Sequence, residues 1–170
     1  GIIGYGNIGS QVSVMAESLG MKVVFFDEAV KLPLGNAEKV KTIKELLKRS
    51  DVLTLHVPGT SNTKSLINKN TLKYCKKGAI LINFARGTVV DLEALRKAIL
   101  DGHMGGAAVD VFPWEPEKQG DPFETPLQGC PNVILTPNIG GSTEEAQENI
   151  GDDVSHKLFH YLETGVTIAS

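Results

Sequence analysis

The sequence has few cysteines and no long apolar run, and each absence excludes a class of protein. Only Cys75 and Cys130 occur in 170 residues, and they form no CxxC pair. Two distant cysteines are typical of reduced thiols and not of a secreted disulfide framework. No apolar stretch reaches the roughly 18 residues that a membrane-spanning helix needs. We therefore expect a soluble, cytoplasmic chain without a membrane partner.

Basic charge is not in excess either. The net charge is -3, which leaves no long basic patch to hold a phosphate backbone, so we expect no nucleic-acid partner. His156 and His160 lie four positions apart near the end of the chain, but the Glu of an HExxH motif is absent. We therefore expect no metal site.

The chain begins without Met and only three residues before a glycine turn, at GIIG. A buried parallel strand usually has about five or six residues. We therefore expect a piece of a longer chain, cut within its first strand.

Short β-rich runs alternate with helical patterns along the chain. Such alternation predicts an α/β fold, a doubly wound parallel sheet with helices on both faces. The predicted strands are short and rich in Val, Ile, Leu or Phe, and they cover residues 1–4, 22–27, 52–57, 79–83, 106–112 and 133–136.

Helix starts are readable between these strands. Thr42 and Glu45 predict a capping box for the helix in TIKELLKR, and Asp91 opens a helix that Gly102 ends.

A second capping box is predicted at Ser142 and Glu145, and a long helix follows it. We predict that this helix buries one apolar stripe, which repeats every four positions at Ala146, Ile150, Val154, Leu158 and Leu162.

The first predicted strand runs into a GxGxxG motif at residues 4–9, which opens a helix. Glycines at these places permit a tight turn, let the backbone approach a pyrophosphate, and let the helix pack on the strand. Asp27 closes the next strand about 18 residues later, where it would accept hydrogen bonds from ribose hydroxyls and repel a 2′-phosphate. No Arg stands beside it, so NAD is favoured over NADP; the alternative is a glycine turn without a ligand.

The later predicted strands end in HVP (56–58), NFARG (83–87), VDVFPWEP (109–116) and TPNIGG (136–141). In doubly wound sheets, ligands bind outside the carboxyl ends of the strands. Arg86 can hold a carboxylate or carbonyl oxygen by its planar fork, or else form a surface ion pair. Glu115 lies on a Pro-rich loop that is too long for a plain crossover, and it is either functional or solvent-facing.

These motifs together resemble the NAD-binding domain of the D-isomer-specific 2-hydroxyacid dehydrogenases, across essentially the whole chain. LPLGNA, LHVPGT, INFARGTVVD, DVFPWEP and GGSTEEAQENIG most resemble the members that act on a small phosphorylated 2-hydroxy acid. The resemblance implies a Rossmann-type domain at residues 1–141 with NAD as cofactor. It also implies a helix at 142–170 that leads back toward a substrate domain, and a homodimer or homotetramer.

The resemblance also implies site roles. The backbone of Asn7 and Ile8 would meet the pyrophosphate, Asp27 the adenosine ribose, and Asp110 the nicotinamide. The full set of cofactor-binding residues that it implies is Gly4, Gly6, Asn7, Ile8, Gly9, Asp27, His56, Val57, Pro58, Phe84, Ala85, Arg86, Asp110, Asn138, Ile139, Gly140 and Gly141.

Arg86, Glu115 and Asn138 are the catalytic positions that the resemblance implies. Arg86 would orient the substrate, and Glu115 would raise the pKa of a catalytic histidine. The family's motif reads Thr-Pro-His-x-Gly-Gly, whereas this chain has Asn138 in the histidine position. An amide cannot accept and release a proton, although Asn also suits a simple turn. The open functions are oxidation of a phosphorylated 2-hydroxy acid, another D-2-hydroxyacid dehydrogenase, or a catalytically silent NAD(H)-binding regulatory protein.

Overall fold

The computed structural model describes residues 1–116 and 121–167. The chain divides into two compact units, Gly1–Thr136 and Pro137–Ser170. Part of the Pro-rich loop, 117–120, and the end of the predicted trailing segment, 168–170, lie outside the described residues. The domain boundary at residue 141, which the family resemblance implies, stays a prediction.

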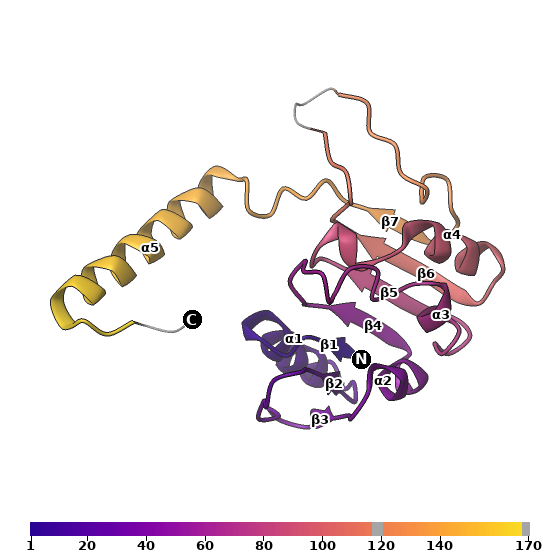
Figure 1. Ribbon diagram of the computed structural model, residues 1–170, viewed down its shortest axis with the longest axis horizontal. Coiled ribbons are helices and arrows are strands. Elements are labelled where there is room, and N and C mark those ends of the chain that lie inside the picture. Colours follow the sequence, from indigo (N-terminus) through magenta and orange to yellow (C-terminus); the bar gives the residue numbers. More distant parts are fainter. Residues whose placement is uncertain (117–120, 168–170) are drawn as a thin grey trace. The chain divides into compact units, whose positions relative to one another are not determined.

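A parallel sheet of seven strands forms the centre of the first unit within the described residues (Figure 1). The chain moves outward from β1 to one edge and then returns to the other side of β1, so the strand order reverses between β1 and β4. This confirms the predicted doubly wound parallel fold. The spatial order is β3 (Glu38–Lys39), β2 (Val24–Phe26), β1 (Ile2–Ile3), β4 (Val52–Leu55), β5 (Ala79–Asn83), β6 (Met104–Val109) and β7 (Val133–Leu135).

Helices cover the sheet on both faces. α2 contacts α3, and α3 contacts α4, so these three helices form one layer (Figure 1). The elements of the first unit besides the strands are α1 (Asn7–Ser18), α2 (Ile43–Arg49), α3 (Lys69–Leu72), the 3-10 turn η1 (Gly87–Val89) and α4 (Leu92–Leu100).

Alternate strand residues supply two separate cores, because successive side chains of a strand point to opposite faces. Ile2 and Phe25 pack in one cluster with Val12 of α1. Their neighbours in sequence, Ile3 and Val24, belong to the other cluster, which contains the buried side chains of α2, α3 and α4. The short apolar runs of the sequence are therefore buried from both sides, as a parallel sheet requires.

The predicted helix starts at Thr42 and Asp91 are confirmed. Thr42 Oγ1 accepts the Glu45 N–H at 3.1 Å, and Asp91 Oδ1 accepts the Ala94 N–H at 3.0 Å. The Glu45 carboxylate does not return to the Thr42 N–H, as a strict capping box requires; it accepts the N–H of Lys41 instead, at 3.2 Å.

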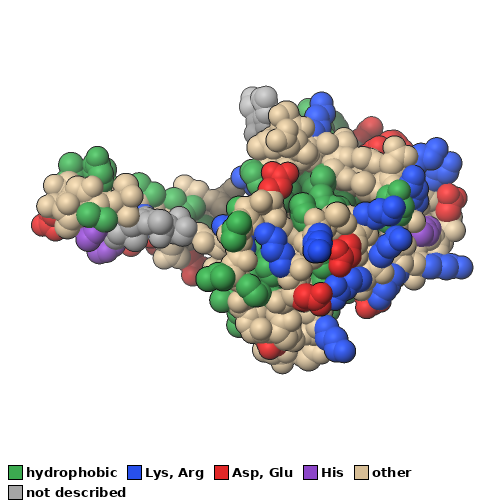
Figure 2. Space-filling view, turned by 60° about the horizontal axis from the view of Figure 1, so that its bottom comes forward, with side chains coloured by type: hydrophobic (Ala, Val, Ile, Leu, Met, Phe, Trp, Pro, Cys, Tyr) green, Lys and Arg blue, Asp and Glu red, His purple; other side chains and the backbone are tan. Residues whose placement is uncertain are grey.

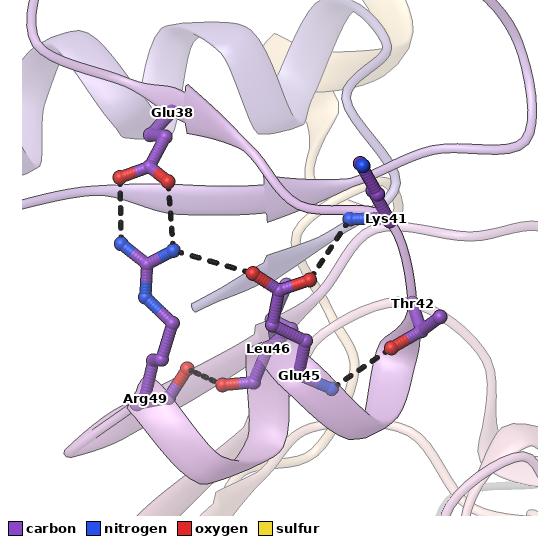
Figure 3. A network of polar contacts seen from close by, with 7 residues as sticks. Glu38, Lys41, Thr42, Glu45, Leu46 and Arg49 are labelled. Carbon is purple, nitrogen blue, oxygen red and sulfur yellow. Dashed lines mark hydrogen bonds and ion pairs between the residues drawn. The ribbon is translucent and has the colours of Figure 1, made fainter.

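An edge strand and a one-turn helix were not predicted from the sequence. Glu38 and Lys39 of β3 are exposed and charged, so they carry no apolar signal. Arg49 at the end of α2 holds this strand by a two-pronged ion pair, with Nη1 and Nη2 at 2.8 and 2.6 Å from the Glu38 carboxylate (Figure 3). Helix α3 is opened by a capping box at Asn68, and four residues are too few to show a helical period.

The second unit contains α5 (Glu144–Thr164), and two predictions about it are wrong. Its cap is Thr143, whose Oγ1 accepts the Ala146 N–H at 3.1 Å, and not Ser142. The predicted stripe is not buried, since Ile150, Val154, Leu158 and Leu162 are between 51% and 74% exposed. Within residues 137–167, α5 has no second helix or strand of its own unit against which to bury such a stripe. Among the described residues, no helix has the length and apolar character to cross a membrane.

The core on the α2 side generates a stability prediction. Leu46 of α2 is 0% exposed, so replacing it with Ala leaves a cavity and should lower the free energy of unfolding by about 2–5 kcal/mol. Leu19, which is 80% exposed, is the matched control, and Leu19→Ala should change stability by at most about 0.5 kcal/mol. Urea unfolding of the two variants measures the difference, and similar losses would contradict this description of the core.

Candidate functional site

The carboxyl ends of the strands meet at one edge of the sheet, because all the strands are parallel and pair in register. Ile3 lies beside Phe26 and Leu55, Leu55 beside Asn83, and Asn83 beside Val109. The residue after each of these strand positions is therefore brought to the same edge. Most of the predicted site lies there, namely 4–9, Asp27, 56–58, 84–86 and Asp110.

Two glycines of the GxGxxG motif are required by the protein itself. Gly4 has φ +91°, a left-handed conformation that favours glycine. A Cβ on Gly9 would lie 2.0 Å from the Gly4 carbonyl oxygen, so glycine is needed for α1 to approach β1 this closely.

Gly6 differs, because no protein atom requires it. Its φ is -82°, which any residue adopts, and a Cβ there would meet nothing within 4 Å. A glycine in open space at the start of a helix leaves room for a ligand to approach the backbone. This observation fits a dinucleotide pyrophosphate at Gly6.

The amino terminus of α1 offers its backbone donors outward. Its cap residue, Gly6, supplies no side-chain hydrogen bond, and no acidic residue lies in the first turn. The first N–H groups of a helix have no partner within the helix, and they carry the positive end of its dipole. This helix start can therefore bind an anion, through the region of Asn7 and Ile8.

The carboxylate of Asp27 is held in a fixed orientation at the end of β2. Oδ2 accepts the N–H of Tyr5 at 2.7 Å, and Oδ1 accepts the N–H of Ala29 at 2.8 Å. Each carboxylate oxygen can accept a second hydrogen bond, so this group can still bind a pair of hydroxyls.

Sequence reasoning found no Arg beside Asp27, but the fold brings two lysines close. Lys39 of β3 donates from Nζ to the carbonyl oxygen of Ala29 at 2.8 Å. Lys39 and Lys41 line a hollow of about 560 Å³ together with Asp27 and Glu28. These two lysines were missed because β3 itself was not predicted.

His56 follows β4 at the same edge. Its Nε2 lies 3.0 Å from Thr54 Oγ1, and burial lowers the pKa of the imidazole below its usual value. The imidazole ring is therefore uncharged at neutral pH, which suits a residue that lines a binding site. Its position on the adenine side stays a prediction, as do those of Val57 and Pro58.

A buried amide shapes the loop that carries Arg86. Asn83 is 0% exposed; its Oδ1 accepts the Ala85 N–H at 3.1 Å, and its Nδ2 donates to the Arg86 carbonyl oxygen at 3.1 Å. Sequence reasoning left Asn83 out of the site, although a buried Asn at a strand end is a usable signal.

The Arg86 side chain is exposed, and its Nη1 donates to the Ala85 carbonyl oxygen at 2.7 Å. Among the described residues, no carboxylate forms an ion pair with it. The alternative of a surface ion pair is therefore not supported.

Asp110 and Glu115 follow β6. Thr136 Oγ1 donates to Asp110 Oδ1 at 2.5 Å, which ties the ends of β6 and β7 together. Glu115 is exposed, and its Oε1 accepts the Phe112 N–H at 3.0 Å. The pairing of Glu115 with the side chain at position 138 stays a prediction.

Asn138 belongs to the second unit, with Ile139, Gly140 and Gly141. Its φ is +53°, the left-handed region in which Asn, Asp and His are enriched among non-glycine residues. This conformation agrees with the turn interpretation of TPN. It equally permits a histidine at this position, so the conformation does not exclude a site role.

A groove of about 890 Å³ lies between α3 and α4, and none of the predicted site residues lines it. Lys69, Lys73 and Lys97 line it together with Asp91 and Glu93. The groove therefore carries side chains of both signs. Figure 2 likewise shows Lys and Arg side chains interspersed with Asp and Glu on the face that it draws. Among residues 1–116 and 121–167, no group of three or more His, Cys, Asp or Glu could hold a metal ion.

Residues 1–140 match the family described as D-isomer specific 2-hydroxyacid dehydrogenase, NAD binding domain. The chain belongs to this family. Membership confirms the resemblance stated from the motifs, and NAD as the cofactor.

The relatives are similar along the entire chain. This chain is 56% identical to the D-3-phosphoglycerate dehydrogenase of Haemophilus influenzae and 52% identical to that of Escherichia coli, over all 170 residues. It spans 42% of the length of each of these relatives.

Two solved structures share the fold of this chain. D-2-hydroxyisocaproate dehydrogenase superposes with a TM-score of 0.84 at 31% identity, over 98% of this chain and 53% of that one. An acyclic imino acid reductase in complex with NADPH and D-Arg has a TM-score of 0.80 at 30% identity, over 95% of this chain and 50% of that one.

The two glycine environments generate a paired prediction. Gly6→Ala should fold normally but weaken NAD binding by about 5- to 150-fold, since overpacking by a methyl group typically costs about 1–3 kcal/mol. Gly9→Ala should instead lower the free energy of unfolding, because its Cβ would collide with the Gly4 carbonyl oxygen. Calorimetric NAD titration and urea unfolding separate the two effects. An unchanged NAD affinity in Gly6→Ala would show that no ligand approaches this glycine.

Proposed function

We propose that this chain is the NAD-binding domain of an enzyme that oxidises 3-phosphoglycerate at C2 to 3-phosphohydroxypyruvate, the reaction that begins serine synthesis. The observation that carries the proposal is the match to D-3-phosphoglycerate dehydrogenases along every residue of the chain. We further propose a cytoplasmic homodimer or homotetramer. Both described cysteines, Cys75 and Cys130, are free thiols, which supports the proposed compartment.

The strand-end edge holds the cofactor in this proposal. The N–H groups at the start of α1 bind the pyrophosphate over Gly6, and Asp27 binds the adenosine ribose through its remaining acceptor positions. When bound, NAD supplies the hydride-accepting chemistry.

Arg86 orients the substrate in this proposal. A guanidinium has five N–H donors, and only one contact, to the Ala85 carbonyl oxygen, is made by its own loop. The donors that remain form a planar fork that matches a carboxylate or a carbonyl beside it. The buried amide of Asn83 keeps the loop in the shape that presents this fork.

Arg86→Lys should lower kcat/KM for 3-phosphoglycerate by about 10- to 100-fold, since a point charge cannot replace a bidentate charge-assisted bond worth about 1.5–3 kcal/mol. Steady-state kinetics of the full-length protein measure this, in the reductive direction if oxidation is slow. Arg96→Lys on α4 is the matched control and should behave as wild type. Wild-type kinetics in Arg86→Lys would remove this role.

A second candidate function is NAD(H) binding without efficient turnover, and Asn138 is the observation that favours it. Oxidation of an alcohol requires the hydroxyl proton to leave together with the hydride, and a histidine near neutral pH usually accepts it. The Asn138 amide can hydrogen-bond the substrate oxygen but cannot take its proton. On this second candidate function, the protein binds NAD but turns over slowly.

Asn138→His should raise turnover of 3-phosphoglycerate by about 10²- to 10⁴-fold, the usual contribution of a general base. The left-handed backbone at position 138 accepts His as well as Asn. Asn132 has φ +57° on a loop before β7, so Asn132→His is a control with the same backbone and should leave turnover unchanged.

Each outcome of this comparison separates the functions. Rapid turnover by the unmodified protein would exclude the silent alternative and a need for histidine at position 138. Turnover of an unphosphorylated 2-hydroxy acid, but not of 3-phosphoglycerate, would assign the chain to another D-2-hydroxyacid dehydrogenase.

A further inference from the structure

We infer that the buried hydroxyl of Tyr5 holds the loop between β2 and β3 (residues 28–37) and thereby sets the affinity for the adenosine half of NAD. The inference rests on the proposed binding of the adenosine ribose at Asp27. Tyr5 acts here as a positioning residue, because its side chain is buried.

Tyr5 occupies the first variable position of GxGxxG and points into the core. It is 3% exposed, and its ring stacks on Phe25 with centroids 3.7 Å apart and planes 18° from parallel. Packing needs only the ring, whereas a buried hydroxyl must find hydrogen-bond partners. The hydroxyl of Tyr5 therefore has a hydrogen-bonding role that phenylalanine could not fulfil.

The partners of this hydroxyl form a chain of hydrogen bonds with one direction. The Leu34 N–H donates to Tyr5 Oη at 3.1 Å, Tyr5 Oη lies 2.7 Å from Ser13 Oγ, and Ser13 Oγ donates to the Ser10 carbonyl oxygen at 2.7 Å. A backbone N–H only donates and a carbonyl only accepts, so Tyr5 donates to Ser13. The middle of the loop is thus tied to α1 through side chains that are buried.

The other hydrogen bonds from this loop to neighbouring elements lie toward its two ends, where Lys39 Nζ donates to the Ala29 carbonyl oxygen at 2.8 Å and Glu17 accepts the Asn36 N–H at 3.1 Å. Val30 and Leu32 are 93% and 84% exposed, so they contribute almost no packing. Asn36 anchors the far end, where its Nδ2 donates to the Met21 carbonyl oxygen at 3.1 Å. Leu34 is therefore the mid-loop residue whose backbone is fixed from the core.

The same tyrosine also fixes the ribose acceptor, since its N–H donates to Asp27 Oδ2 at 2.7 Å. Tyr5 thereby links Asp27 and the loop that follows it to one rigid element. Ordering that loop before the cofactor arrives lowers the entropy lost on binding. Tyr5→Phe keeps the ring stacking and the N–H bond to Asp27, and removes only the hydroxyl.

The test compares Tyr5→Phe with the wild-type protein by calorimetry, using NAD and ADP-ribose. The dissociation constants of both ligands should rise by the same factor, about 5- to 30-fold for a lost buried hydrogen bond that orders the loop. Ser13→Ala should give a smaller rise, because Tyr5 can still accept the Leu34 N–H. Tyr161→Phe, at a tyrosine that is 50% exposed on α5, is the matched control and should bind as wild type.

Amide hydrogen exchange of the free protein separates a local from a global effect. The Leu34 amide should exchange faster in Tyr5→Phe, while the amides of β5 keep their protection. Unchanged ADP-ribose affinity, or a loss for NAD alone, would overturn the inference while leaving the proposed function intact. Faster exchange throughout β5 would also overturn it, because the hydroxyl would then be a general stabiliser. Failure of the wild-type protein to bind either ligand would overturn the proposed NAD site as well.

Discussion

The close packing of α1 on β1 is the constraint on which the rest of the site depends. A helix can lie this near the Gly4 carbonyl oxygen only because Gly9 has no side chain. That approach directs the first N–H groups of α1 toward the strand-end edge and brings Tyr5 N–H to the Asp27 carboxylate. The proposed anion site and the proposed ribose site therefore both depend on one steric contact.

Hydrogen bonds from buried or partly buried groups hold the residues of the candidate site in place. Asn83 shapes the Arg86 loop, Thr136 holds Asp110, and the Tyr5 N–H orients Asp27. Preorganisation of this kind lowers the entropy that a bound ligand would otherwise cost. The positions of Arg86, Asp110 and Asp27 at this edge are thus decided by hydrogen bonds to neighbouring elements.

The sequence predicted the central strands and the main helix starts well, because their signals are local. Apolar runs predicted β4, β5, β6 and β7 within a few residues, and a side-chain oxygen three residues before its N–H partner predicted the caps at Thr42 and Asp91. β3 and α3 were not predicted, because a strand of two charged residues and a helix of a single turn show no periodic apolar pattern. The prediction that the α5 stripe is buried was wrong, because amphipathic spacing shows that a helix face is apolar but not which element covers it.

By itself, the sequence determined the family, the cofactor and the glycine turn, since these depend on residue types at fixed local spacing. It also placed Asn138 where the family has His. Only the tertiary structure decided which polar groups meet across long separations, such as Leu34 with Tyr5 and Lys39 with Ala29. Such pairs are set by sheet order and side-chain burial, and neither is a property of neighbouring residues along the chain. Hydrogen bonds between residues close in sequence can therefore be predicted from residue spacing. The hydrogen bonds that position the site form only when the strands pair.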